Sequence, residues 1–171
     1  GKCLLTMAFV KNSIMLLFLL PDKKAASVIH ILDYLEAGLG SDRFKRLFPL
    51  FLTDNGAEFK KVERLEANEK YENRTRVYYC DRMAPWQKAL IEKNHEYIRY
   101  VLPKGQSMDH LTQEDVTRLM NHINSTRRRS LKWKSPYDLI NEDDTDMKAL
   151  FTLLKMHPIP ADEVHLEPDL I

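Results

Sequence analysis

The stretch FPLFLTDNGAEF, residues 48–59, joins an apolar run directly to a carboxylate and a glycine turn. The apolar run predicts a short buried strand that ends at Asp54. The pair Asn55-Gly56 favours a tight turn, which would leave the Asp54 side chain exposed at the end of that strand. A carboxylate placed there can hold a divalent metal ion. The alternative is that Asp54 is only a turn residue, which is the commoner role of aspartate before Asn-Gly.

A second acidic candidate, Glu92, lies in the stretch WQKALIEKNH, residues 86–95. The spacing of its apolar residues predicts a helix from about Trp86 to Val101. Carboxylates on separate elements can bridge the metal ions that assist phosphoryl transfer. Together with Asp54, Glu92 therefore suggests metal-dependent phosphoryl transfer on nucleic acid.

Basic residues accompany Glu92 on the same predicted helix. Arg99 follows it by nearly two helical turns, so both side chains project from one face, where an arginine can contact a phosphate near bound metal. Lys88 and Lys93 flank the acid and can touch a DNA backbone. The alternative is that Glu92 is a solvated residue in weak ion pairs with these two lysines.

Composition leaves the class of the protein open. The 171-residue chain is 44% hydrophobic and 30% charged, which is ordinary for one globular domain, and its net charge of +1 argues against a uniformly cationic protein. A basic cluster, RRRSLKWK at 127–134, is nevertheless followed by the acidic stretch 142–146. The basic cluster has two interpretations, phosphate contact and an ordinary solvated face. The acidic stretch is expected to be a linker to a final helix, with no ligand role.

Neither the cysteines nor the apolar runs point to another class. Cys3 and Cys80 form no C-x-x-C pair or Cys/His ligand spacing, so two reduced, buried thiols are expected and a zinc site is not. The most apolar run, 14–20, is far shorter than the roughly 20 residues that span a bilayer. We expect a cytoplasmic protein without a membrane partner.

Periodicity and turn residues predict an α/β order of elements. Strands are expected at 2–10 and 13–20 as an antiparallel hairpin, at 50–53 and at 75–80, with a charged, partly helical excursion at 59–73. Helices are expected from Ala25 to Leu39, at 86–101, from Thr112 to about Asn124, briefly after Pro136, and from Met147 to Leu154.

Six short motifs occur in the same order as in a known family. They are Thr53-Asp54-Asn55-Gly56, Tyr79-Cys80-Asp81 with Trp86-Gln87, Glu92-Lys93-Asn94, Leu102-Pro103-Lys104-Gly105, Leu111-Thr112-Gln113-Glu114-Asp115 and Asn121-His122-Ile123-Asn124. With these motifs the chain resembles family thirty of the bacterial insertion-sequence transposases over essentially its whole length. The resemblance implies a ribonuclease-H-like mixed sheet flanked by helices and an Asp-Asp-Glu site that binds Mg²⁺ or Mn²⁺.

The resemblance also implies roles for individual residues. Asp54 matches the second acid and Glu92 the third, and both would be catalytic and bind metal, with Asn55 and Gly56 supporting the turn. In the family the first acid lies on the strand before the hairpin, and Gly1-Lys2 looks like the end of the turn that follows it. The residues expected to contact DNA are Lys88, Lys93, Asn94, Arg99, Arg127, Arg128 and Lys132.

A missing first acid has chemical and structural consequences. Asp22 and Asp33 are poor substitutes, because one lies at the far end of a hairpin strand and the other within a helix. Without the central strand the sheet would have an exposed seam, or the hairpin would have to shift inward to pair with the Asp54 strand. We expect residues 1–141 to form an incomplete catalytic core, inactive alone, and 142–171 to form a helical extension.

Two functions are compatible with this interpretation. The first is the partial catalytic core of a transposase, which in the intact, oligomeric protein would cleave transposon ends and transfer strands in the bacterial nucleoid. The second is an inactive remnant that binds DNA or a full-length partner.

Overall fold

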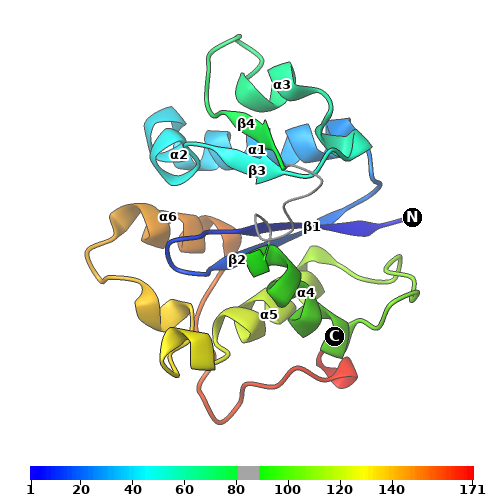
Figure 1. The fold of residues 1–171 in the computed structure, drawn as a ribbon, viewed down its shortest axis with the longest axis vertical. Helices are drawn as coiled ribbons and strands as arrows, with labels where there is room; N and C mark the ends of the chain where they lie inside the picture. Colours follow the sequence, from blue (N-terminus) through cyan, green and yellow to red (C-terminus); the bar gives the residue numbers. More distant parts are fainter. Residues whose placement is uncertain (81–88) are drawn as a thin grey trace.

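The computed structural model covers residues 1–171 and describes residues 1–80 and 89–171 (Figure 1). Its strands are β1 (Cys3–Ala8), β2 (Met15–Leu20), β3 (Phe51–Thr53) and β4 (Val77–Tyr79). Its α-helices are α1 (Ala25–Leu39), α2 (Ser41–Leu47), α3 (Val62–Glu66), α4 (Ala89–Val101), α5 (Gln113–Asn124) and α6 (Thr145–Leu154). Single 3-10 turns are η1 (Ala57–Phe59), η3 (Arg129–Leu131), η4 (Tyr137–Leu139) and η5 (Pro168–Leu170). The expected α/β class is confirmed.

The β1–β2 hairpin forms as the apolar runs predict. Its strands pair antiparallel from Cys3 with Leu20 to Ala8 with Met15. At the turn, Ser13 adopts a left-handed backbone (φ 63°), and Oδ1 of Asn12 accepts a hydrogen bond from the Ile14 N–H at 3.0 Å. β2 is almost entirely buried, which makes it the centre of the core.

α5 covers the outer edge of β2. The helix begins at a capping box between Thr112 and Asp115, as its sequence predicts. Its amide side chains then bond the strand: Oε1 of Gln113 accepts from the Leu19 N–H at 2.8 Å, and Oδ1 of Asn124 accepts from the Met15 N–H at 2.8 Å. The edge of β2 is therefore closed without another strand.

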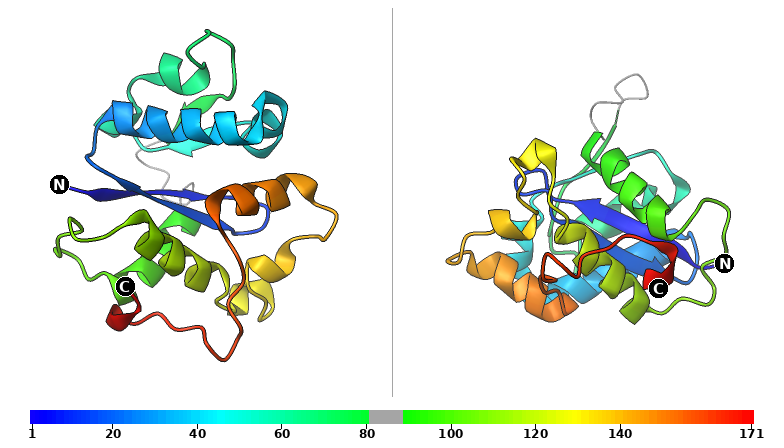
Figure 2. Two further views of the ribbon diagram at one scale, coloured as in Figure 1. Left: turned by 180° about the vertical axis from the view of Figure 1, so that it is seen from behind. Right: turned by 90° about the horizontal axis from the view of Figure 1, so that it is seen from below.

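The second strand pair lies on the other side of the molecule, alongside α1 (Figures 1 and 2). β3 and β4 pair in parallel, Phe51 with Val77 through Thr53 with Tyr79. α1 ends at its C-cap, Gly40, whose φ of 84° suits glycine. α2, which the sequence did not predict, follows directly and buries Phe44.

The four described strands form two separate pairs, β1–β2 and β3–β4. The mixed sheet expected from the sequence is thus divided between the Asp54-bearing strand and the hairpin. The described strands therefore do not join into one mixed sheet.

α6 packs on α1 and α2 and joins the same core through Met147 and Leu150. Asp144 caps it by accepting from the Met147 N–H at 3.1 Å. Asp146 lies between Arg43 and Arg46 of α2, at 3.2 and 2.9 Å from their Nε atoms, and the pKa of its carboxyl is lowered chiefly by the hydrogen bond from Arg46. The acidic stretch expected to be only a linker therefore helps to fasten this helix.

Within residues 1–80 and 89–171, no helix combines the length and the apolar character that membrane crossing requires.

Candidate functional site

Asp54 follows β3 directly, at the point where that strand leaves β4. The last ladder bond runs from the Cys80 N–H to the Thr53 carbonyl at 2.8 Å. The chain then turns, and Oδ1 of Asp54 accepts from the Gly56 N–H at 3.0 Å. The side chain is exposed, as the sequence predicts, and this turn fixes one of its oxygens.

Gly56 permits a close approach of two carboxylates. A methyl group at this position would meet Oδ1 of Asp54 at 2.9 Å and Oε2 of Glu58 at 2.7 Å, so both acids converge on the same point. The φ of Gly56 is −68°, which any residue can adopt. The close approach of the two carboxylates therefore depends on the lack of a side chain at Gly56, and not on an unusual backbone conformation.

Glu58 is a site residue that the sequence reasoning missed. The η1 turn brings its side chain back beside Asp54, where it is 14% exposed and 3.8 Å from Nζ of Lys23. The signal that could have found it is the second acid four positions after Asp54, across a predicted turn. Asp22 and Asp33 do not join this group, because Ser27 bonds the first and Arg74 and Arg64 pair with the second.

α4 supplies the other wall of the site. Glu92 is exposed on the first described turn of this helix, with His95 and Arg99 on the same side. Nε2 of His95 lies 3.1 Å from Oγ1 of Thr6, which fixes α4 against β1. The start of the predicted helix, including Lys88, lies outside the described residues.

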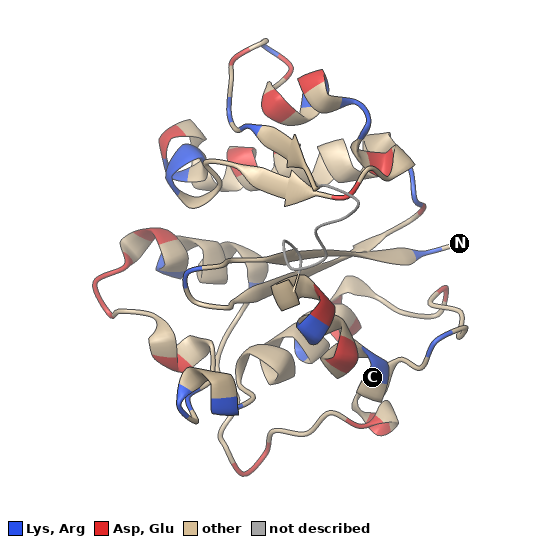
Figure 3. Ribbon diagram, viewed as in Figure 1, with Lys and Arg blue, Asp and Glu red and all other residues tan. Residues whose placement is uncertain are grey.

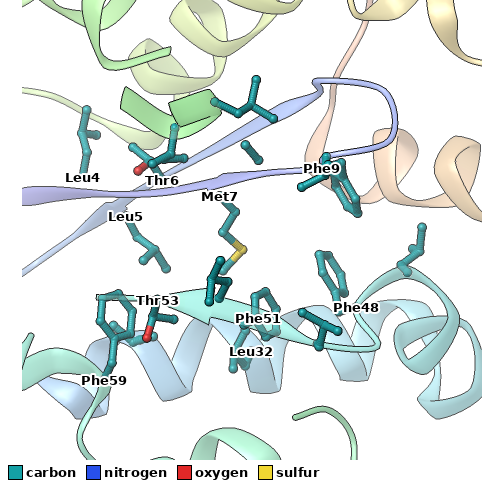
Figure 4. A pocket seen from close by; sticks show the side chains of 18 of the residues that line it. Leu4, Leu5, Thr6, Met7, Phe9, Leu32, Phe48, Phe51, Thr53 and Phe59 are labelled. Carbon is teal, nitrogen blue, oxygen red and sulfur yellow. The ribbon is translucent and has the colours of Figure 1, made fainter. Parts of the chain in front are cut away.

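A cavity of about 1020 Å³ connects these elements. Asp54 and Glu58 line it from the β3 side, and His95 and Arg99 line it from α4. Figure 4 shows its walls, with Thr53 and Phe59 on the side of β3 and Leu5 and Met7 on the side of β1. Glu92 lies one helical turn before His95 and is not among the residues that line the cavity.

The donor chemistry suits Mg²⁺, although the described residues hold no group of three His, Cys, Asp or Glu arranged around one metal ion. Mg²⁺ is usually bound by one or two carboxylates, with phosphate and water oxygens completing an octahedron. Asp54 and Glu58 provide two converging carboxylates, and Glu92 carries a further carboxylate on α4.

Two residues expected to contact DNA are instead buried. Asn94 is 0% exposed, and within residues 1–80 and 89–171 its amide nitrogen and oxygen have no hydrogen-bond partner. Arg128 is 6% exposed; its guanidinium lies 4.8 Å from the Tyr97 ring centre and donates to the Ile123 carbonyl at 3.2 Å. Burial lowers the pKa of Arg128. Because neither side chain reaches the surface, we correct both assignments.

The remaining described members of that set are exposed: Lys93, Arg99, Arg127 and Lys132. Nζ of Lys93 lies 3.0 Å from Glu96, which raises the pKa of the lysine through this hydrogen bond.

Arg128 anchors the basic cluster of residues 127–134. Its N–H bonds the Lys134 carbonyl at 3.1 Å, and between them Lys132 and Trp133 take left-handed backbones, with φ of 54° and 64°. Trp133 is 67% exposed at the tip of this loop. The lysines and arginines of the cluster form the blue group at the lower left of Figure 3. The loop presents basic and aromatic side chains to solvent.

Comparisons with known proteins place the chain among mobile-element proteins, although no family model matches it. It is 30% identical over 128 residues to the transposase for insertion sequence element IS1086 of Cupriavidus metallidurans, which aligns 73% of this chain with 34% of that protein. It is 29% identical over 94 residues to the transposase for IS4351 of Bacteroides fragilis, covering 55% of the chain and 28% of that protein. It is 32% identical over 65 residues to transposase InsI for IS30A of Escherichia coli, covering 38% and 17%. The chain thus spans about a third or less of these relatives, and it is related to the insertion-sequence transposases.

Proposed function

We propose that the chain forms part of the catalytic core of a DNA transposase, with Asp54 and Glu92 as metal-binding acids of an Asp-Asp-Glu site in a ribonuclease-H-like fold. The observation that carries the proposal is the position of Asp54. It follows β3 at the end of a cavity that α4 closes from the other side, and the relatives are transposases. Bound Mg²⁺ or Mn²⁺ would activate the attacking oxygen and stabilise the leaving oxygen during strand cleavage and transfer.

The residues of this chain position the substrate and the ligands. Asp54, oriented by the hydrogen bond from the Gly56 N–H, would supply a carboxylate to a metal ion, and Glu58 adds negative charge beside it. Arg99 lines the same cavity and can bind a phosphate that approaches the metal ion. These roles account for cleavage chemistry at transposon ends in the intact protein.

DNA is the partner that this proposal requires. Lys93, Arg127 and Lys132 are exposed and can bind backbone phosphates, which gives affinity without sequence information. Trp133 can stack on an unpaired base beside them. We further propose that the intact protein is a homo-oligomer, because two transposon ends must be joined.

The second candidate is an inactive remnant that binds DNA or a full-length partner. The open seam between the strand pairs favours it, as does the absence of a three-ligand group among the described residues. On either proposal we expect no strand transfer by this chain alone, since two metal ions need more carboxylates than Asp54 and Glu92 provide.

Calorimetric titration with Mn²⁺ and Mg²⁺ tests the assignment of the acids. We expect Asp54→Asn and Glu92→Gln each to weaken metal binding at least tenfold. Glu96→Gln is the matched control, because Glu96 is also exposed on α4 but pairs with Lys93. Equal binding by all four proteins would show that the acids are assigned wrongly.

The dependence of DNA affinity on salt concentration distinguishes the two candidates from an unrelated function. Replacing Lys93, Arg127 or Lys132 with alanine should each reduce the slope of log affinity against log salt by about 1. Arg128→Lys, at the buried anchor, should perturb the loop instead. A chain that binds no DNA, or whose binding shows no salt dependence, would contradict both candidates.

A further inference from the structure

Residues 156–171 cross α5 and end beside α4 (Figure 1). The crossing starts at Met156, which is buried and directly follows the left-handed Lys155 at the end of α6. It finishes at η5, where Leu170 is 7% exposed and the turn contacts α4. The segment therefore ties α5 to the helix that carries Glu92.

One side of α5 holds this segment. The residues that bond it recur at helical spacing: Arg118, Asn121, His122 and Ser125. Oδ1 of Asn121 accepts from the His157 N–H at 3.1 Å, and Oγ of Ser125 accepts from the Ile159 N–H at 2.9 Å. Amide and hydroxyl side chains do not change charge between pH 5 and pH 8. The near half of the segment, residues 156–159, is therefore attached in a way that pH does not change.

Among the described residues, two hydrogen bonds join the far half, residues 160–171, to α5. Nδ1 of His122 accepts from the His165 N–H at 3.2 Å, and the guanidinium of Arg118 donates to the Leu170 carbonyl at 3.4 Å. The rings of His122 and His165 meet edge to face, with their centres 5.1 Å apart. Of the two bonds, the first uses an acceptor that titrates near neutral pH.

A proton on His122 removes that bond. A neutral imidazole that accepts at Nδ1 carries its hydrogen on Nε2, whereas the protonated ring carries hydrogens on both nitrogens and accepts at neither. Two N–H groups would then point at each other across 3.2 Å. The new charge would also lie near the imidazole of His165 and the guanidinium of Arg118. The bound segment therefore requires a neutral His122.

The surroundings of His122 disfavour its protonated form. Burial, then His165 and then Arg118 all lower the pKa of this ring. Asp169 lies 3.9 Å from His165, and Asp115 lies 3.5 Å from Arg118, so each acid accompanies a neighbour of His122. β2 is wholly apolar, and no charged group of α4 among the described residues acts on the ring. A protonated His122 would thus gain no acidic partner in the described part of the chain.

We propose that residues 160–171 form a strap that protonation of His122 releases from α5 and α4, while residues 156–159 stay attached as its hinge. The released segment leaves His122 free to take up a proton, so release is favoured as pH falls below about 6.5, the ordinary pKa of histidine. Release withdraws Leu170 and η5 from α4 and uncovers part of that helix. The proposal rests on these contacts and not on the proposed function.

Amide hydrogen exchange of the full chain, followed by NMR at pH 7 and pH 5, tests the strap. Protection factors are compared, because they remove the intrinsic effect of pH on exchange. We expect protection of the His165 amide to fall at least tenfold at pH 5, together with that of Leu170, whose N–H bonds the Glu167 carbonyl within η5. The amides of His157 and Ile159 should keep their protection within about twofold, since their acceptors do not titrate.

Histidine variants locate the switch. His122→Gln supplies an amide oxygen that accepts at either pH, so protection at His165 should change by less than about twofold. His30→Gln is the matched control, because His30 is exposed on α1, and it should keep the tenfold change. His165→Ala keeps the donating N–H and removes the ring, so the response to pH should remain.

A second measurement keeps the test informative if His122→Gln misfolds. The imidazole nitrogen signals of His122 in the unaltered chain report its protonation directly. Their titration midpoint should coincide with the midpoint for loss of protection at the His165 amide.

Three results would overturn the proposal. One is protection at His165 that is equal at pH 7 and pH 5. Another is a response that persists in His122→Gln or disappears in His165→Ala, since either would assign it to another group. The third is a parallel loss at His157 and Ile159, which would mean that the whole segment detaches or the chain unfolds.

Discussion

The two outer edges of the β1–β2 hairpin differ in whether other parts of the chain form hydrogen bonds with their main-chain groups. The β2 edge meets α5, where Gln113 and Asn124 satisfy its main-chain groups. The β1 edge faces the cavity, and its alternate main-chain groups bond to no other described element. An unpaired strand edge can recruit another strand. The β1 edge of the hairpin can therefore still pair, whereas the β2 edge is already satisfied by α5.

The largest effect that tests this comparison is a pair of truncations on opposite strands. Leu16 and Met7 are register partners, but Leu16 is 0% exposed and Met7 is half-buried against the cavity. We expect Leu16→Ala to lower the free energy of unfolding by about 3 kcal/mol, and Met7→Ala by about 1 kcal/mol. Urea unfolding of both variants measures the difference. Equal losses would mean that the β1 side is packed as fully as the β2 side.

The closed edge itself is tested by Asn124→Ala. Asn124 is 0% exposed, and it both accepts from the Met15 N–H and donates to the Met15 carbonyl at 2.8 Å. Its removal leaves two buried groups unsatisfied, so we expect a loss of about 2 to 3 kcal/mol in the free energy of unfolding. Gln113→Ala, at an exposed position, should cost about 1 kcal/mol. A cost for Asn124→Ala no larger than that of Gln113→Ala would contradict the closed edge.

Gly56→Ala tests the turn after β3, where the carboxylates of Asp54 and Glu58 lie close together. The new methyl group would force the carboxylates of Asp54 and Glu58 apart, because both lie within 3.0 Å of its position. We expect Mn²⁺ affinity to fall by about threefold or more, while stability changes by less than about 1 kcal/mol, since φ is ordinary there. Calorimetry and urea unfolding separate the two effects. Gly105→Ala is a useful contrast, since its φ of 89° predicts lost stability without lost metal affinity.

The smallest expected effect is a pH dependence on the far side of α5. His122 is buried there, and Nδ1 accepts from the His165 N–H at 3.2 Å, which holds the C-terminal tail. Burial, and then His165 and Arg118, lower the pKa of His122. The unfolded chain therefore takes up a proton more readily, so stability should fall as pH drops below about 6.5. Unfolding of His122→Gln should show a flatter profile between pH 7 and 5, and an unchanged slope would assign the effect elsewhere.

Local pattern was enough to predict much of this fold. The hairpin, the start of α5 at Thr112 and the turn after Asp54 each depend on residues close in sequence, and each was confirmed. α2 was missed because Gly40 ends one helix and also precedes the next. The division into two strand pairs was anticipated only through the family resemblance, since no spacing in the chain encodes an unpaired edge.

The site was predicted less completely, because burial depends on distant contacts. Asn94 and Arg128 belong to polar stretches and were expected at the surface, but Tyr97 and the end of α5 enclose the arginine. Glu58 was overlooked because only the η1 turn brings it to Asp54. The type and order of residues named Asp54 and Glu92 as candidate acids, and tertiary packing decided which basic side chains reach the surface.

The seam also determines the geometry of the proposed catalytic pair. Asp54 follows β3, whereas Glu92 lies on α4. The contact between His95 and Thr6 holds α4 against β1. The separation of the two carboxylates is therefore set by the width of the gap between β1 and β3. A change in the width of that gap would therefore change metal affinity at the proposed pair without altering either carboxylate.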